Sequence, residues 1–399
     1  MKKIGIFWEN FEYGGVSKYL ITLINNKKFK NYKFTIITNS SNKALQNLRK
    51  KTKKKNLNII LYRSINQIII KNFFLKVIFF ILKPIVFALS IFQIYFILKK
   101  KKFDIFISQC GGFGDFRTDF ASIIIAKIFK YPIRSAVLHH CYTKPKMWSR
   151  TINIINYYIA NLCTSLIFVS KATFNNIKKR TFILNNNKIY SEIINNGINI
   201  NKIRKKNYFK KKKYITHALV LSRIEYNKGH TDLIEAFRYL PHHIKKKIKV
   251  YFVGQGKYEF ISKIKDKILH YKLQNNFVFT GFISKDSREI ISNFDILLSP
   301  TRDFEGFGLS IAEALSVGVP IISTKVGGVM DYLSKENSIL IEPRNPKMLA
   351  NSLKFFIKNK VKCKKMALEG QKLIKKSFSA ELMSANYINH FDKIKKLNV

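Results

Sequence analysis

Residues 296–324 read ILLSPTRDFEGFGLSIAEALSVGVPIIST. The apolar run 296–299 predicts a buried strand, and the glycine-rich turn that follows it opens a helix. Pro320–Ser323 then predicts a second strand. A strand, a helix and a strand in succession indicate a crossover unit, which joins two parallel strands of one sheet.

The same alternation of strands and helices continues in both directions from this segment. Further strands are predicted at Lys3–Trp8, Phe34–Thr38, Phe103–Ser108, Arg134–Leu138, Ser165–Val169, Ala218–Ser222, Lys249–Val253, Val278–Thr280 and Ser338–Ile341. A polar, basic linker at 199–213 separates two series of these elements. The sequence therefore predicts an α/β protein with two Rossmann-like αβα domains, 1–200 and 201–379, and an amphipathic C-terminal helix at 380–399.

The composition limits the class of protein and its surroundings. The chain has 399 residues, of which 47% are apolar, and a formal net charge of +50. The apolar share excludes intrinsic disorder. The charge indicates anionic surroundings, namely membrane headgroups, phosphorylated ligands or nucleic acid, although the abundance of Lys, Asn, Ile and Phe that AT-rich coding produces explains it equally well. Four separated cysteines and an N-terminus without a long apolar run predict a reduced, cytoplasmic protein with no signal peptide.

One apolar segment, Phe73–Leu98, raises the question of a membrane. Its longest uncharged part begins at Pro84 and has 15 residues, short of the ~20 that cross a bilayer. Basic runs at 49–55 and 99–102 flank it. We expect two helices, broken at Lys83-Pro84, that partly pack on the domain and partly lie in an anionic membrane surface. Helices packed entirely in the core are the alternative.

Two carboxylates and the glycine turn carry the clearest chemical signal. Glu305 precedes the turn, and backbone N–H groups at a helix start favour an anion. Glu313 lies eight residues later, so the two carboxylates are up to ~12 Å apart, too wide for the ~5 Å pair of a retaining glycosidase. The spacing suits an elongated ligand with hydroxyls at both ends and a phosphate between them. Ordinary surface acids are the alternative interpretation.

Basic residues and histidines follow other predicted strands. Arg223 ends one strand and Lys228 begins the next helix, so both are expected at one edge of the sheet, as a diphosphate requires. In the first domain, Gly15 lies in the turn after the first strand, and His139 and His140 follow another strand. A lone histidine is usually structural, but two at a strand end make a binding role equally plausible.

In order and spacing, these motifs resemble glycosyltransferase family 4, whose members are retaining, nucleotide-sugar-dependent enzymes with the GT-B fold. The most specific part is the Glu305/Glu313 pair with Glu-Ala-Leu at 313–315 and Gly-Val-Pro at 318–320. The supporting motifs are Gly14-Gly15, Asn196–Asn199, Ser222–Gly229 and Gly327-Gly328. The resemblance runs nearly from end to end of the chain.

The resemblance implies a role for each matching residue of the second domain, which would bind the donor. Arg223 and Lys228 would bind the donor diphosphate, Glu305 the hydroxyls of the transferred sugar, and Glu313 the ribose. The turn that contacts sugar and phosphate through its backbone would comprise Gly306, Phe307, Gly308 and Leu309. The donor would be a UDP- or GDP-linked hexose.

The resemblance also implies roles for the first domain, which would bind the acceptor and carry the C-terminal helix. Gly15 would let its loop reach the diphosphate, and His139, in preference to His140, would lie near the transferred sugar. The sequence has no D-x-D motif, so we expect no metal and no cofactor, with Arg223 and Lys228 in the place of a metal. The reaction would be a front-face substitution with retention.

The leading hypothesis is a peripheral enzyme on the inner face of the cell membrane. It would build a cell-envelope polysaccharide on a lipid-linked, lipopolysaccharide or capsule acceptor. A GT-B epimerase or phosphorylase is one alternative, and a basic nucleic-acid-binding protein is another, although no motif for specific nucleic-acid binding is present. The sequence leaves the base, sugar, acceptor, linkage and oligomeric state undetermined.

Overall fold

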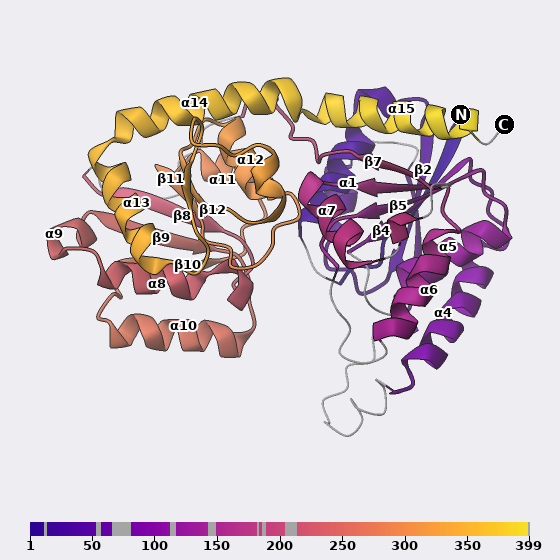
Figure 1. The fold of residues 1–399 in the computed structure, drawn as a ribbon, viewed down its shortest axis with the longest axis horizontal. Helices are drawn as coiled ribbons and strands as arrows, with labels where there is room; N and C mark the ends of the chain where they lie inside the picture. The colour runs from indigo at the N-terminus through magenta and orange to yellow at the C-terminus, as the bar shows by residue number, and fades with distance from the viewer. Residues whose placement is uncertain are drawn as a thin grey trace. The chain divides into compact units, whose positions relative to one another are not determined.

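The computed structural model describes residues 1–11, 14–52, 57–65, 81–111, 117–142, 149–181, 183–185, 189–203 and 214–397. The chain divides into two compact units, of which the first is Met1–Gly197 with Ala380–Val399 and the second is Ile198–Ser379 (Figure 1). Gly112, residues 73–80 of the apolar segment and residues 204–213 of the expected linker lie outside the described residues. Each unit is built on one wholly parallel sheet, which confirms the predicted α/β fold class.

The first unit has a seven-stranded sheet in the order β3-β2-β1-β4-β5-β6-β7. The strands are β1 (Lys2–Phe7), β2 (Tyr32–Asn39), β3 (Leu57–Tyr62), β4 (Ile105–Cys110), β5 (Ile133–Leu138), β6 (Ser165–Phe168) and β7 (Tyr190–Ile193). The order reverses at β1, which pairs with both β2 and β4. In open parallel sheets, ligands bind beyond the carboxyl ends of the strands at such a reversal.

Helices cover both faces of this sheet (Figure 1). They are α1 (Gly15–Asn25), α2 (Leu45–Lys51), α4 (Lys83–Leu98), α5 (Thr118–Ile128), α6 (Ser149–Ala160), α7 (Lys171–Arg180) and α15 (Ala380–Leu397). On one face, Phe120 of α5 packs against Cys110 and Leu138. α1 and α15 are joined by their buried tyrosines, because the hydroxyl of Tyr19 donates to that of Tyr387 at 2.6 Å. The last helix of the chain thus belongs to the first unit.

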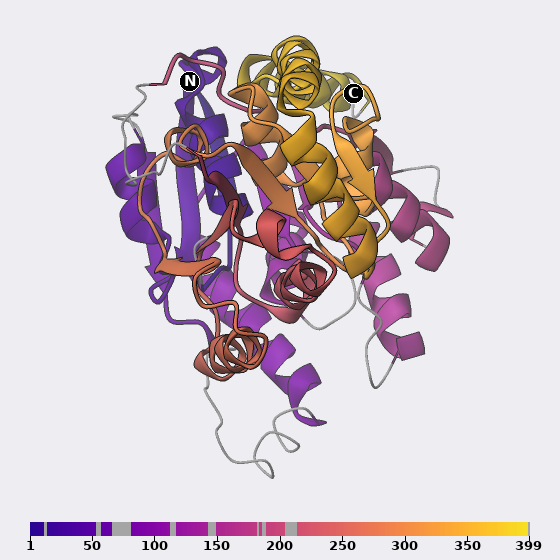
Figure 2. The ribbon, with the colours of Figure 1, turned by 90° about the vertical axis from the view of Figure 1, so that its left-hand side faces the viewer.

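The second unit has a six-stranded sheet in the order β10-β9-β8-β11-β12-β13. Its strands are β8 (Thr216–Leu221), β9 (Ile248–Val253), β10 (Phe277–Gly281), β11 (Ile296–Ser299), β12 (Ile321–Thr324) and β13 (Ile339–Ile341). Its α-helices are α8 (His230–Arg238), α9 (His242–Lys245), α10 (Tyr258–His270), α11 (Ser287–Ile291), α12 (Leu309–Ser316), α13 (Pro346–Lys358) and α14 (Lys360–Ser377). Leu233, Ile264 and Leu353 of α8, α10 and α13 pack on one face, and α11, α12 and α14 lie on the other (Figures 1 and 2).

α4 buries only a narrow stripe of its apolar surface. The helix begins at Lys83 with Pro84 in its first turn, where a missing N–H costs no hydrogen bond. The expected break is therefore the start of a helix. The buried residues are Val86, Ser90, Ile94 and Leu98. The large exposed apolar residues of the helix and its approach are Ile81, Leu82, Ile85, Leu89, Phe92 and Phe96. In the described part of the chain, no helix is long and apolar enough to cross a membrane.

Candidate active site

Predicted site residues meet at the carboxyl edge of the second unit's sheet. Lys228 lies in the short helix η4 (Tyr226–Lys228) after β8, and Glu305 lies in the loop after the neighbouring strand β11. The Lys228 Nζ and Glu305 Oε2 atoms are 2.6 Å apart, and the side chains are 19% and 21% exposed. The fold thus forms a half-buried ion pair between residues that are 77 positions apart in the sequence.

A glycine makes this pairing possible. Gly229 follows Lys228 with a φ of +70°, a backbone conformation that residues with a side chain rarely adopt. A Cβ at this position would lie 1.8 Å from the carbonyl oxygen of Pro300. Because only glycine lets η4 approach the end of β11 so closely, the Lys-Gly pair of the sequence brings the ammonium group to Glu305.

Arg302 holds the same loop against η4 and α8. Its guanidinium pairs with Asp232, with Nε 2.7 Å from Oδ2, and donates to Thr231 Oγ1 at 2.9 Å. The group also lies over the Tyr226 ring, 4.2 Å from the centroid. The backbone N–H of Arg302 donates to the Asn227 carbonyl at 2.8 Å. Sequence reasoning missed these contacts of Arg302, because one arginine among 73 basic residues carries no signal by itself.

The backbone around Glu305 is held from the next loop. A Cβ at Gly327, which has a φ of +64°, would lie 2.2 Å from the Glu305 carbonyl oxygen. The Gly328 N–H donates to that same oxygen at 2.7 Å. The buried Tyr332 hydroxyl donates to the Phe307 carbonyl at 2.8 Å. The Gly-Gly motif after β12 therefore supports Glu305 and the turn that follows it.

The turn leads into α12, which supplies backbone donors. Gly308 is the N-cap residue with a φ of +78°, and Leu309 is the first residue of the helix. The first N–H groups of a helix have no acceptor within it, and with the helix dipole they favour an anion. Glu313 is in the second turn and is buried. One short segment thus carries the Gly306–Leu309 turn and both predicted carboxylates.

Arg223 has a different partner from Lys228. Its side chain is 57% exposed, and its Nη2 lies 3.1 Å from Glu225 Oε1. The sequence predicts two cations at one crevice. In the structure each cation is paired with its own carboxylate, Arg223 with Glu225 and Lys228 with Glu305.

In the first unit, the predicted residues lie in the connections that follow two strands. Gly15 is the exposed first residue of α1, in the connection that follows β1. His139 and His140 follow β5, with His139 half-buried and His140 exposed.

The imidazole of His139 is held by two neighbours. Its Nε2 lies 2.6 Å from Gln109 Oε1, and its ring meets the Tyr19 ring edge-on, with centroids 5.1 Å apart. The backbone N–H of His139 donates to the Cys110 carbonyl at 3.0 Å, which extends the β4–β5 pairing by one residue. Burial lowers the pKa of His139 to about 3, so the ring is neutral near pH 7.

Sequence reasoning also missed Gln109. It ended the strand at Ser108, whereas β4 continues to Cys110 and includes Gln109. The available signal was a polar residue two positions before the Gly111 turn, between an apolar run and a cysteine. A strand extended by two residues would have placed Gln109 at the sheet edge beside His139.

Comparisons with known proteins find one family model and several relatives that match parts of this chain. Residues 199–373, a little under half of the chain, match the model of the family described as Glycosyl transferases group 1. The uncharacterized glycosyltransferase MJ1069 of Methanocaldococcus jannaschii is 25% identical over 321 residues, which are 78% of this chain and 80% of that protein. MJ1607 of the same organism is 29% identical over 135 residues, 33% of each chain. The Staphylococcus aureus capsular polysaccharide biosynthesis glycosyltransferase CapM is 26% identical over 198 residues, 47% of this chain and 50% of that protein.

A solved structure extends the likeness to the whole chain. The structure of Anabaena Alr3699/HepE in complex with UDP and glucose has a TM-score of 0.75 and 17% identity, and the match covers 98% of this chain and 100% of that chain. At this identity, the likeness shows the fold alone. The fold is GT-B, with two Rossmann-like domains and a C-terminal helix that returns to the first of them. MJ1607 and CapM are matched over about a third and about half of their lengths.

Proposed function

We propose that the chain is a group 1 glycosyltransferase that moves a hexose-type sugar from a nucleoside diphosphate sugar to a glycan hydroxyl, with retention of anomeric configuration. The observation that carries the proposal is the Lys228–Glu305 pair beside the N-terminus of α12. A cation, a carboxylate and unpaired N–H groups together suit a phosphate next to a sugar hydroxyl. The family match and the likeness to the UDP complex of Alr3699/HepE support this class of reaction.

The site supplies charge where the reaction develops it. When the bond between the anomeric carbon and the diphosphate breaks, negative charge grows on the leaving group. Lys228 and the N–H groups at the start of α12 would stabilise that charge, and Arg223 would join them if the diphosphate displaces Glu225. Glu305 would accept hydrogen bonds from sugar hydroxyls and Glu313 from the ribose. With these groups in place, we propose that the diphosphate is bound without a metal.

Retention follows if the acceptor attacks from the side on which the diphosphate leaves. The acceptor oxygen then bonds to the anomeric carbon, and its proton passes to the departing diphosphate oxygen. This route needs no enzyme nucleophile. We assign His139 to contact with the transferred sugar and Gly15 to contact with the diphosphate.

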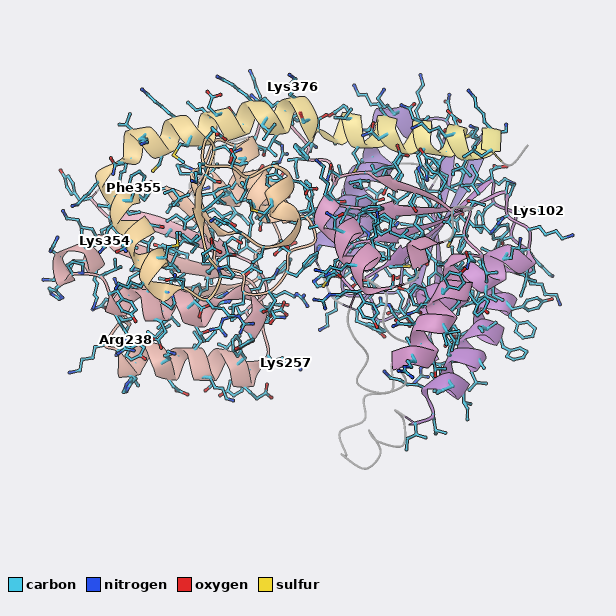
Figure 3. All side chains as sticks on the ribbon, viewed as in Figure 1. Lys102, Arg238, Lys257, Lys354, Phe355 and Lys376 are labelled. Atoms are coloured by element: carbon cyan, nitrogen blue, oxygen red, sulfur yellow. The ribbon has the colours of Figure 1, made fainter. Side chains whose placement is uncertain are left out.

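We propose further that the acceptor is a lipid-linked, lipopolysaccharide or capsule glycan and that the enzyme works on the inner membrane surface. The exposed apolar face of α4 supports this, with Phe92 65% and Phe96 69% exposed. Lys99–Lys102 follow the helix and are exposed, with Lys102 on the outer surface in Figure 3. An apolar helix face beside lysines suits an anionic lipid surface. The similarity to CapM supports a glycan acceptor.

The donor can be identified by thermal unfolding with nucleoside diphosphates and nucleotide sugars, with and without a chelator. A ligand that binds the native state and not the unfolded chain raises the unfolding temperature. We expect one nucleotide series, uridine or guanosine, to stabilise the protein equally in both conditions. If none of them stabilises it, the proposed donor site is wrong. A shift that the chelator abolishes would instead contradict metal-free binding.

The site assignment is tested by Lys228→Ala. We expect a loss of transfer of about 10²-fold or more with the fold intact, since the removed group acts on transition-state charge. The control is Lys376→Ala, because Lys376 is exposed on the outer side of α14 (Figure 3). Wild-type turnover in Lys228→Ala would overturn the role of Lys228.

A further inference from the structure

The surroundings of His139 select one of its two neutral forms. β4 and β5 pair so that Gln109 lies opposite Val137. Side chains two positions apart in a strand share a face, so His139 lies on the same face as Gln109. Tyr19 of α1 closes this face against the imidazole ring. The histidine therefore has a hydrogen-bonding neighbour within its own sheet.

The contact with Gln109 determines where the imidazole carries its hydrogen. The nearest atom of Gln109 to His139 Nε2 is the amide oxygen, Oε1, at 2.6 Å, and an amide oxygen can only accept. The hydrogen must then be on Nε2. The Gln109 side chain is buried, and its Nε2 atom has no hydrogen-bond partner among the described residues.

The second ring nitrogen is then a lone-pair acceptor. Nδ1 of His139 has no hydrogen-bond partner among the described residues, and the ring is only partly buried. Burial is the single cause of the lowered pKa, with no contribution from a charged group, so the ring does not become a cation near neutral pH. A neutral ring nitrogen with a lone pair accepts a hydrogen bond from a hydroxyl, whereas an ionised phosphate oxygen has no hydrogen to donate to it.

We propose that Gln109 is a positioning residue that holds His139 as the Nε2–H tautomer, so that Nδ1 accepts a hydrogen bond from a hydroxyl of the transferred sugar. This inference rests on the proposed function, and it adds to it a residue, a tautomer and the direction of a hydrogen bond. Gln109 itself contacts no substrate in this scheme. It acts through His139 alone.

The tautomer can be observed without any ligand. In the full-length protein with ¹⁵N-labelled histidine, two-bond proton–nitrogen NMR correlations distinguish the Nε2–H, Nδ1–H and doubly protonated rings, and His139→Asn assigns the signals by their loss. We expect the Nε2–H pattern at pH 7. A Nδ1–H pattern or a charged ring would overturn the proposal, whatever the activity of the preparation.

Two variants of Gln109 test its role in binding. In Gln109→Leu, which removes the acceptor, we expect a five- to tenfold rise in KM for the nucleotide sugar, the value of about one hydrogen bond. Affinity for the free nucleoside diphosphate should not change, because it lacks the sugar. Gln109→Glu keeps the acceptor but favours a charged ring, so its activity should fall as the pH decreases and recover at high pH, unlike that of the wild type.

These outcomes separate the inference from the proposed function. If the wild type and the Gln109 variants bind the nucleoside diphosphate equally, and Gln109→Leu also leaves the KM for the nucleotide sugar unchanged, Gln109 has no positioning role. A Gln109→Glu variant whose pH profile matches the wild type would contradict it as well. If no nucleoside diphosphate binds the wild type, the proposed function fails, while the NMR pattern still decides the tautomer.

Discussion

Glu9 is a carboxyl group that the proposed reaction does not use. It follows β1, and its Oε1 accepts from the hydroxyls of Tyr62, at 3.3 Å, and Ser64. The Thr118 hydroxyl donates to its other oxygen. Burial raises the pKa of Glu9 to about 7, and the nearby Asp119 acts in the same direction. Glu9 is therefore protonated in the folded protein at a pH where an exposed glutamate is ionised.

This raised pKa predicts a fall in stability as pH increases. Between pH 4.5 and 7, the unfolded chain has released the Glu9 proton and the folded chain still holds it, so the free energy of unfolding decreases with rising pH. We expect Glu9→Gln to remove this contribution, about 3 kcal/mol across the window. Urea unfolding of both proteins from pH 4.5 to 8 measures it. Parallel curves for the two proteins would show that Glu9 is ionised in both states.

At the residue scale, the sequence was most informative where a local motif also determines the backbone conformation. Lys228 lies next to Gly229, and Glu305 opens the turn that ends at Gly308, and both glycines have a positive φ, so these motifs carry structural information as well as chemistry. Gln109 and Arg302 act through partners far away in the sequence, namely His139 and Asp232. Such contacts depend on strand register and loop packing, which the residue pattern alone does not reveal. Arg223 was predicted by its strand end, but its pairing with Glu225 was not.

At the scale of elements, the connection from β8 to α8 gives a prediction with a matched control. Gly229 and Gly281 have nearly the same φ, +70° and +69°. A Cβ at Gly281 would meet nothing within 4 Å, whereas one at Gly229 would meet Pro300. Gly281→Ala should therefore cost only the backbone strain, about 1–2 kcal/mol. Gly229→Ala should cost considerably more and weaken nucleotide binding, because η4 must move and carry Lys228 with it.

Denaturant unfolding and nucleotide titration of both variants make this comparison. Equal losses of stability, with nucleotide affinity intact in Gly229→Ala, would mean that the contact between Gly229 and Pro300 does not position Lys228.

Two strands of the first sheet were not predicted from the sequence. β3 and β7 form the two edges of the first sheet, and their residues are mostly half-buried or exposed. β7, with the sequence Tyr-Ser-Glu-Ile, has no continuous apolar run, whereas β3 has one at 59–62 that sequence reasoning overlooked. α15, by contrast, was predicted with its start at Ala380 correct, because its apolar residues recur with helical periodicity.

At the scale of the whole molecule, the alternation of strands and helices was sufficient to predict the fold class, because parallel sheets require a crossover between successive strands. The chain divides between Gly197 and Ile198 and again between Ser379 and Ala380. The net charge of +50, however, is explained either by an anionic membrane partner or by composition alone. A charge that results from composition alone attracts any anionic surface through salt-sensitive forces. A membrane site must also bury apolar surface, and α4 presents such a surface.

Vesicle binding separates these two explanations. We expect the protein to bind phosphatidylglycerol vesicles. Changing Leu89, Phe92 and Phe96 together to Gln should lower the affinity at least tenfold, because in the wild type each of these exposed apolar side chains is transferred from water into the lipid surface. The control is the same change at Tyr258 and Leu269, which are exposed on α10 of the second unit. Binding that the triple variant retains, and that salt alone abolishes, would assign the attraction to charge and leave the face of α4 without a role at the membrane. If vesicle binding is lost in the triple variant and kept in the control variant, α4 itself must enter the lipid surface, because the two variants have the same charge.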